Sequence, residues 1–187
     1  MQAIILVGGK GTRLNALYPD LPKALVPVAG RPFIEWQIEW LAKGGVSHVH
    51  LAAGHKADVL QKWAARAKLP GVELTLSQEP APLGTAGGLK FVESLIRSDP
   101  FLVLNGDSLL PNLNFQTLEK PEAFFPMFGK KEPVFSNVWT ILVVTEIRQT
   151  ARYGTVEFDE SGRVTAFREK ANRSSGWINA GIYLMKK

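Results

Sequence analysis

Short runs of apolar residues alternate with segments of helical periodicity along the first half of the chain. Strands are predicted at residues 3–7, 48–53, 72–77 and 101–104, and helices at residues 32–43, 57–68 and 85–97. Gly44 and Gly45 end the first helix, and Pro70 and Gly71 end the second. Because strands and helices alternate, we expect right-handed crossovers and a parallel sheet covered on both faces, which is a three-layer α/β sandwich.

The pattern changes in the second half of the chain, where residues 111–133 contain few periodic stretches. Strands are predicted at residues 138–146 and 178–185, and a Glu-Ser-Gly turn flanked by residues 155–159 and 163–168 indicates a β-hairpin. We therefore expect a single domain over residues 1–187. Residues 1–110 would build the parallel part of a mostly parallel sheet, and residues 111–187 would add an antiparallel flap.

Two interpretations concern side chains within these elements. The first helix has an apolar stripe, formed by Phe33, Trp36, Ile38 and Leu41. His48 and His50 alternate on one face of the second strand. Because no third ligand accompanies them, a half-exposed strand face is favoured over a metal site.

The composition excludes several classes of function. The 187 residues are 45% hydrophobic and 21% charged, which is typical of a globular protein. The net charge of +5 suits an anionic ligand, but the basic residues are too scattered for a nucleic-acid surface. The lack of cysteine excludes disulfides, cysteine-ligated zinc and a thiol nucleophile, and is compatible with the cytoplasm. The apolar runs are too short for a signal peptide or a membrane span, so no membrane partner is expected.

The first chemical candidate is Gly-Gly-Lys-Gly-Thr-Arg-Leu at residues 8–14, directly after the first strand. Its glycines allow a sharp turn and bring backbone N–H groups close to an anion, to which Arg13 adds positive charge. The spacing fits neither G-x-G-x-x-G nor a Walker A loop. On its own, such a turn is weak evidence for phosphate binding.

Two other loops carry charged candidates. Lys23 lies in Leu-Pro-Lys-Ala-Leu-Val-Pro-Val at residues 21–28, a stiff segment that places its side chain at little entropic cost, although a solvated lysine is the alternative. Asp107 follows the fourth strand in an Asn-Gly-Asp turn. Ligands collect at the carboxyl ends of parallel strands, which favours a Mg²⁺ ligand there over a simple cap of the turn.

For a nucleotide ligand, which the family resemblance given below implies, Glu79 and the glycine-rich residues 83–88 would be the candidates for binding the base. A carboxylate can accept hydrogen bonds from both the N1–H and the exocyclic amine of guanine, whereas uracil and thymine offer one imide donor. Gly84, Gly87 and Gly88 would allow close approach of the base and ribose. The alternative is that Glu79 is a surface residue of a loop.

The motifs at residues 8–14 and 21–28 together resemble those of the nucleoside-triphosphate:sugar-1-phosphate nucleotidylyltransferases. Further matches follow in family order over essentially the whole chain, at residues 83–88, 105–107, 152–154, 167–170 and 179–181. The forms Leu-Gly-Thr-Ala-Gly and Arg-Tyr-Gly-Thr-Val are most similar to the guanylyltransferases for mannose 1-phosphate and D-glycero-D-manno-heptose 1-phosphate, with the heptose type favoured. The resemblance implies a Rossmann-like, glycosyltransferase-A-like nucleotidyltransferase fold.

The resemblance also implies a reaction, in which a nucleoside monophosphate, most favourably GMP from GTP, passes to a sugar 1-phosphate and pyrophosphate leaves. Arg13 would clamp the pyrophosphate, Lys23 would neutralise the α-phosphate, and Asp107 would hold the Mg²⁺ cofactor. Residues 1–110 would be the nucleotide-binding half. Its predicted nucleotide-binding residues are Leu6, Gly8, Gly9, Gly11, Thr12, Arg13, Lys23, Glu79, Gly84, Thr85, Asn105 and Gly106.

By the same resemblance, residues 111–187 would be the sugar-phosphate-binding half. Lys170 would hold the phosphate, while Glu169, Asn179 and the backbone at Gly154 would bind hydroxyl groups. The full predicted set is Tyr153, Gly154, Glu169, Lys170, Asn179 and Gly181. Without the family pattern, Glu169 and Lys170 would be interpreted only as a charged pair after a hairpin.

The chain departs from the family at its C-terminal end. Family members continue past the Asn-Ala-Gly strand with helices and a late aspartate that gives Mg²⁺ a second carboxylate, whereas this chain stops at Lys187. We therefore expect the domain to lack its C-terminal part, and expect weak or absent activity from these 187 residues. The alternatives are a non-catalytic nucleotide-sugar-binding regulatory subunit and a uridylyl- or thymidylyltransferase of the same family. The sugar motifs disfavour a molybdopterin guanylyltransferase, and the sequence allows a homo-oligomer.

Overall fold

The computed structural model describes residues 1–115, 118, 140–150, 153–168 and 175–187. These residues form two compact units, one made of Met1–Pro111 with Met185–Lys187 and the other of Asn112–Leu184.

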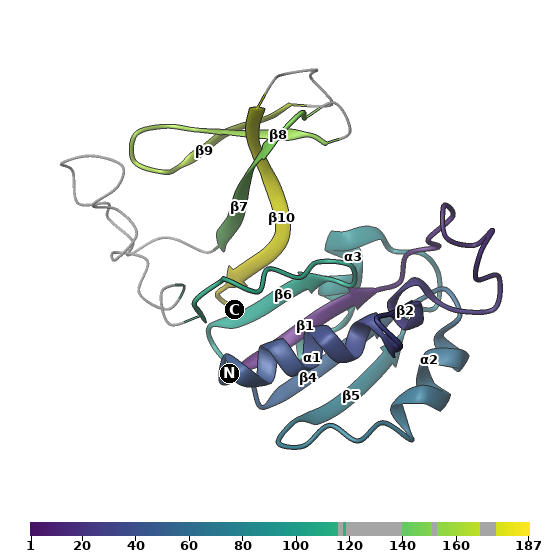
Figure 1. The fold of residues 1–187 in the computed structure, drawn as a ribbon. Helices are drawn as coiled ribbons and strands as arrows, with labels where there is room; N and C mark the ends of the chain where they lie inside the picture. The colour runs from purple at the N-terminus through teal and green to yellow at the C-terminus, as the bar shows by residue number, and fades with distance from the viewer. Residues whose placement is uncertain (116–117, 119–139, 151–152, 169–174) are drawn as a thin grey trace. The chain divides into compact units, whose positions relative to one another are not determined.

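The first unit contains four parallel strands (Figure 1). They are β1 (Gln2–Val7), β4 (His48–Ala53), β5 (Glu73–Gln78) and β6 (Phe101–Asn105), in the spatial order β5-β4-β1-β6. All six residues of β4 are buried, as are most of β1 and β6. Strands buried along almost their whole length are what a parallel sheet covered on both faces requires.

Three helices cover this sheet: α1 (Phe33–Lys43), α2 (Ala57–Ala64) and α3 (Gly84–Phe91). The chain passes from β1 to β4 to β5 in one direction and then returns to β6. Right-handed crossovers therefore place α1 and α2 on one face and α3 on the other. Trp63 Nε1 of α2 donates to Glu35 Oε1 of α1 at 3.3 Å, and Figure 1 shows α1 lying across one face of the sheet. The predicted three-layer α/β sandwich with a mostly parallel sheet is confirmed.

The buried face of α1 differs from the predicted stripe. Its buried residues are Ile34, Gln37, Ile38 and Leu41, at helical i, i+3, i+4 and i+7 spacing. Trp36 lies beside this face because its indole has other partners: Nε1 donates to the carbonyl of Val28 at 2.9 Å, and the Arg31 guanidinium lies 4.4 Å from the ring centroid. The expectation for Phe33 and Trp36 was therefore wrong, and a polar residue, Gln37, takes a core position.

Helix ends and short elements also differ from the prediction. The second and third predicted helices end early, at Ala64 and Phe91, and a single 3-10 turn, η2 (Glu93–Leu95), follows α3. Three short elements were not predicted, because two or three residues are too few to show a period: η1 (Lys23–Leu25), β2 (Pro27–Val28) and β3 (Arg31–Pro32). The turn between β2 and β3 has positive φ at both Ala29 and Gly30, as tight hairpins do.

The second unit is antiparallel, as predicted for the second half. It contains β7 (Thr140–Arg148), β8 (Thr155–Phe158), β9 (Val164–Arg168) and β10 (Ser175–Met185). β8 pairs with β10 and with β9 in antiparallel fashion, and β7 pairs with β10. In the turn of the predicted hairpin, Asp159 Oδ1 accepts hydrogen bonds from the backbone N–H groups of Ser161 and Arg163.

The two strand histidines are buried rather than half-exposed. His48 and His50 are 8% and 2% exposed, and a ring nitrogen of each lies within 3.0 Å of Thr75 Oγ1 on the neighbouring strand β5. His50 also contacts Ser77 Oγ at 2.9 Å. Burial lowers the pKa of His50 to about 4 and also lowers the pKa of His48. Hydroxyl groups on β5 therefore allow imidazoles to occupy core positions.

Candidate active site

The carboxyl ends of the four parallel strands border one cavity of about 650 Å³ in the first unit. The strand register explains this arrangement, because Val7 pairs with Ala53 and Ala53 with Gln78, while Leu6 pairs with Asn105. The loops after β1, β4, β5 and β6 therefore begin at the same edge of the sheet. Strand order reverses direction between β1 and β6, and ligands of α/β proteins bind in the crevice at such a point.

Most of the predicted nucleotide-binding residues line this cavity, together with Asp107. They are Leu6, Gly8, Gly9, Lys23, Glu79, Gly84, Thr85, Asn105, Gly106 and Asp107. Separate segments of the sequence thus converge on one cavity. Their roles in binding stay predictions, but the geometry required for a shared site is present.

Gly11, Thr12 and Arg13 are not among the residues that line the cavity. Gly11 has a φ of +57° and starts a helical turn, in which its carbonyl accepts a hydrogen bond from the N–H of Leu14 at 2.8 Å. A Cβ on Gly11 would lie 3.1 Å from Lys23 Cβ, so this turn packs against Lys23. Thr12 and Arg13 themselves are exposed.

Lys23 and Asp107 form an ion pair at the cavity. Lys23 is the first residue of η1 and Asp107 lies in the turn after β6, so the pair joins segments 84 residues apart. Their side chains are 40% and 47% exposed, which leaves both accessible to a ligand. The site therefore presents a cation and a carboxylate side by side.

Asp107 fits a role as one ligand of Mg²⁺. Mg²⁺ is commonly held by one or two carboxylates, with water and substrate phosphate oxygens completing its shell. No group of three His, Cys, Asp or Glu side chains able to hold a metal ion occurs among the residues that the structure describes. A metal at Asp107 would accordingly take most of its ligands from a phosphate substrate and water.

Glu79 belongs to the cavity and is not an isolated surface residue. Its Oε2 accepts a hydrogen bond from the N–H of Leu83 at 3.2 Å. Its Oε1 occupies the space that a side chain at residue 88 would need, because an ideal Cβ built on Gly88 would lie 2.5 Å from it. An ideal Cβ built on Gly8 would lie 3.4 Å from the same oxygen. The carboxylate therefore lies between the loop after β1 and α3. This position agrees with the predicted base-binding role and argues against the alternative.

Several cavity residues were missed by the sequence analysis. They are Val7, Lys10, Ala24, Gly54, His55, Gln78, Pro80, Ala81 and Pro82. An ideal Cβ on Gly54 would lie 3.0 Å from both the Cα and the carbonyl oxygen of Gly8, and the N–H of His55 donates to that oxygen at 3.2 Å. The available signal was positional, because Gly54 directly follows its strand as Gly8 follows β1.

The described sugar-phosphate candidates lie in the second unit. Thr155 of β8 pairs with Ile178 of β10, so their chain neighbours Gly154 and Asn179 lie in the same part of this ladder. Asn179 Oδ1 accepts from the N–H of Gly181 at 2.7 Å, and its Nδ2 donates to the hydroxyl of Tyr183, also at 2.7 Å. Tyr153 is 50% exposed. Glu169 and Lys170 lie outside the described residues.

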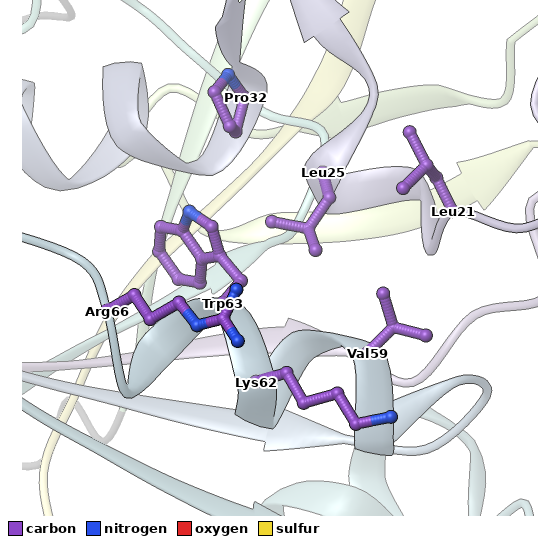
Figure 2. Close-up of a pocket in the computed structure, with 7 residues that line it drawn as sticks. All are labelled: Leu21, Leu25, Pro32, Val59, Lys62, Trp63 and Arg66. Atoms are coloured by element: carbon purple, nitrogen blue, oxygen red, sulfur yellow. The ribbon is translucent and has the colours of Figure 1, made fainter.

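A second pocket, of about 370 Å³, lies beside η1 and α2 (Figure 2). It is lined by Leu21, Leu25, Pro32, Val59, Lys62, Trp63 and Arg66. None of the predicted site residues lines it. Leu21 and Leu25 flank Lys23 in sequence, so one short segment borders both cavities.

A family model described as nucleotidyl transferase matches residues 2–187. The D-glycero-alpha-D-manno-heptose 1-phosphate guanylyltransferase of Campylobacter jejuni is 34% identical over 187 residues, which are 100% of this chain and 76% of that protein. The mannose-1-phosphate guanylyltransferase catalytic subunit beta of Xenopus tropicalis is 38% identical over 189 residues, 98% of this chain and 49% of that protein. The chain thus spans about half the length of the mannose-1-phosphate relative.

Solved structures share the fold. HddC from Yersinia pseudotuberculosis in complex with GMP-PN gives a TM-score of 0.83 at 27% identity, covering 99% of this chain and 76% of that chain. The inositol-1-phosphate CTP transferase from T. maritima gives a TM-score of 0.72 at 22% identity, covering 99% and 70%. The predicted family and fold are both confirmed.

No helix within the described ranges is long and apolar enough to cross a membrane.

Proposed function

Because the chain belongs to the nucleotidyl transferase family, we propose that it transfers GMP from GTP to a sugar 1-phosphate of the mannose or manno-heptose type. The observation that carries this proposal is the single cavity that brings together the glycine-rich loop, the Lys23–Asp107 pair and Glu79. The guanylyltransferase names of two relatives, 34% and 38% identical, support the choice of base and sugar.

In this reaction an oxygen of the sugar 1-phosphate attacks the α-phosphorus of GTP, and the bond to pyrophosphate breaks. The nucleophile is already anionic, so the reaction needs no general base. Two polyanions must instead be brought together, which makes positioning and charge neutralisation the catalytic task. Cations and backbone N–H donors are the groups that perform it.

The chain supplies these groups at the cavity. The N–H groups of Gly8 and Gly9 would bind the triphosphate, and Lys23 would offset charge at the α-phosphate. Asp107 would hold Mg²⁺, which when bound neutralises phosphate charge. Arg13, whose side chain is exposed, would bind the departing pyrophosphate through its planar guanidinium.

Glu79 would select the base. One of its oxygens already accepts from Leu83, and carboxylate oxygens have further lone pairs to accept from the two adjacent donors of guanine. A base with one donor would leave part of this acceptor unsatisfied once the bound base covers it, which costs binding energy.

The sugar phosphate would bind through Tyr153, Gly154, Asn179 and Gly181, together with Glu169 and Lys170. We place the reaction in the cytoplasm, in line with the cysteine-free composition.

A binding and turnover panel with the 187-residue chain tests the proposal. GTP, UTP, dTTP and CTP are each titrated calorimetrically with Mg²⁺, and each is then incubated with mannose 1-phosphate or manno-heptose 1-phosphate while pyrophosphate release is followed. We expect GTP to bind most tightly and any release of pyrophosphate to come from GTP alone. Tighter binding of another nucleotide, or pyrophosphate release from it, would overturn the guanylyl assignment.

The variant Glu79→Gln isolates base selection within this panel. It keeps the shape of the side chain but replaces one acceptor oxygen with a donor amide. We expect GTP affinity to fall about tenfold or more, the usual cost of a mismatched buried hydrogen-bonding group. UTP affinity should change much less. An equal loss for both nucleotides would show that Glu79 does not read the base.

A further inference from the structure

Gln37 is a fully buried polar residue at the centre of the apolar face of α1, with 0% exposure. Its neighbours on that face, Ile34, Ile38 and Leu41, are all aliphatic. A primary amide in such a position must find hydrogen-bond partners, because an unsatisfied buried amide destabilises the fold. Its partners therefore indicate why a glutamine is present.

The side-chain amide of Gln37 reaches the loop that carries Asp107. Its Nε2 donates to the carbonyl oxygen of Asn105 at 3.0 Å and to that of Ser108 at 2.5 Å. Because both partners are acceptors, only the NH₂ side of the amide can face them, which fixes its orientation. Gln37 Oε1 is buried without a hydrogen-bond partner among the described residues.

Two backbone hydrogen bonds also hold the Asn105–Ser108 turn. The N–H of Ser108 donates to the carbonyl of Asn105 at 3.1 Å, and the N–H of Gly106 donates to the carbonyl of Leu6 at 2.9 Å. The Gln37 amide binds the carbonyls at both ends of the turn. Asp107 lies between those two carbonyls, and its carboxylate pairs with Lys23.

We propose that Gln37 is a positioning residue that fixes the Asn105–Ser108 turn from the core side and thereby holds the Asp107 carboxylate toward Lys23 and a phosphate-bound Mg²⁺. This inference rests on the proposed function and assigns a role to a residue that touches no substrate. An apolar side chain would fill the same space and avoid the unpartnered Oε1, but it would leave the carbonyls of Asn105 and Ser108 without this donor. The hydrogen bonds to the turn, rather than packing against the core, therefore explain why a glutamine occupies position 37.

The test compares Gln37→Met with Leu41→Met in the full chain. Methionine is close in volume to both residues, so each variant places the same side chain on the buried face of α1, and only the first removes donors to the turn. The measurements are the Mn²⁺ dissociation constant in the presence of GTP, amide hydrogen exchange at residues 105–108, and KM and kcat for GTP. Circular dichroism and thermal melts check that both variants are folded.

We expect Gln37→Met to weaken Mn²⁺ binding by about 10- to 100-fold, the usual effect of removing a group that orients a metal ligand. Exchange at residues 105–108 should become faster, while Leu41→Met leaves both quantities at the wild-type values. Unchanged metal affinity and unchanged exchange in a folded Gln37→Met would overturn the proposal. Equal losses in both variants would also overturn it, because they would show a purely structural effect.

The two proposals can fail separately. If the wild-type chain neither binds GTP nor transfers a nucleotide, the proposed function fails, and hydrogen exchange still decides whether Gln37 fixes the turn. If the wild type is active and Gln37→Met matches it in metal affinity and exchange, the proposed function stands and the positioning role is wrong.

Discussion

Glu79 and Gly88 lie so close together that an ideal Cβ on residue 88 would be 2.5 Å from Glu79 Oε1, a distance real Cβ atoms do not tolerate. Gly88 is the buried residue of α3, and Glu79 directly follows β5. The missing side chain at residue 88 therefore creates the space in which the carboxylate lies. This contact links the start of the Glu79 loop to the helix that forms one wall of the candidate site.

Substituting Gly88 by alanine should displace Glu79 with little cost to the fold. Alanine has a higher helix propensity than glycine, by up to about 1 kcal/mol, and Glu79 can rotate away because its end is flexible. We expect the melting temperature to stay near that of the wild type while GTP affinity falls about tenfold, as for other mispositioned hydrogen-bonding groups. Calorimetric titration and a thermal melt measure the two quantities.

The double variant Gly88→Ala/Glu79→Ala is the control for this mechanism. If the added methyl acts through the carboxylate, it should have almost no further effect once the carboxylate is gone. Additive losses of GTP affinity would contradict the mechanism.

Gly54 should tolerate no side chain, because its neighbour is backbone. An ideal Cβ there would lie 3.0 Å from the Cα and the carbonyl oxygen of Gly8, and neither can rotate aside. Gly54→Ala is expected to lower the free energy of unfolding by about 1–3 kcal/mol, as overpacking does. Gly9→Ala is the matched control: nothing lies within 4 Å of its Cβ position, so we expect a change of less than about 0.5 kcal/mol. Urea unfolding of both variants measures the difference, and equal losses would contradict the clash.

Arg13→Ala should reduce turnover by about 10²- to 10³-fold, the typical effect of removing a group that stabilises transition-state charge. Because Arg13 is exposed, the free energy of unfolding should change by less than about 0.5 kcal/mol. Arg66→Ala removes the same charge from the other pocket and is expected to leave turnover unchanged. Steady-state rates of pyrophosphate release test both variants. Full activity of Arg13→Ala would remove this residue from the mechanism.

The buried histidines should make the protein sensitive to acid. The pKa of His50 is about 4 in the folded chain, against 6.5 for the unperturbed side chain, because burial disfavours the charged imidazole. The unfolded chain therefore binds more protons between these values. Stability from the neutral His50 is fully present above about pH 6.5 and is lost as the pH falls toward 4, by about 3 kcal/mol in total.

Urea unfolding at pH 7, 6, 5 and 4 measures this dependence. In His50→Gln, which does not titrate in this range, the loss of stability with falling pH should be shallower; His48, whose pKa is also lowered, accounts for part of the remainder. Identical pH profiles for the wild type and the variant would show that His50 is not the titrating group.

The sequence identified cavity-lining residues where they lie in a contiguous motif, and missed those whose position depends on contacts across the fold. Gly8, Lys23 and Asp107 were identified because each lies in a short segment of unusual composition. Gly54 and His55 carry no such motif, and they became visible only when the register of β1 and β4 placed them beside Gly8. Arg13 shows the opposite limit, because its motif is clear yet Arg13 is not among the residues that line the cavity.

The local sequence pattern was enough to predict the alternation of strands and helices, the parallel sheet and the family. Hydrophobic periodicity, and the glycine and proline residues that end helices and strands, are properties of residues close together in the sequence. The side of a helix that is buried, the surroundings of Glu79 and the pairing of Lys23 with Asp107 depended instead on the folded chain. Each is set by atoms many residues away in sequence. Gln37 is the clearest case. Within its own helix it is a polar residue on an apolar face, and its hydrogen-bond partner Asn105 lies in a turn 68 residues further along the chain.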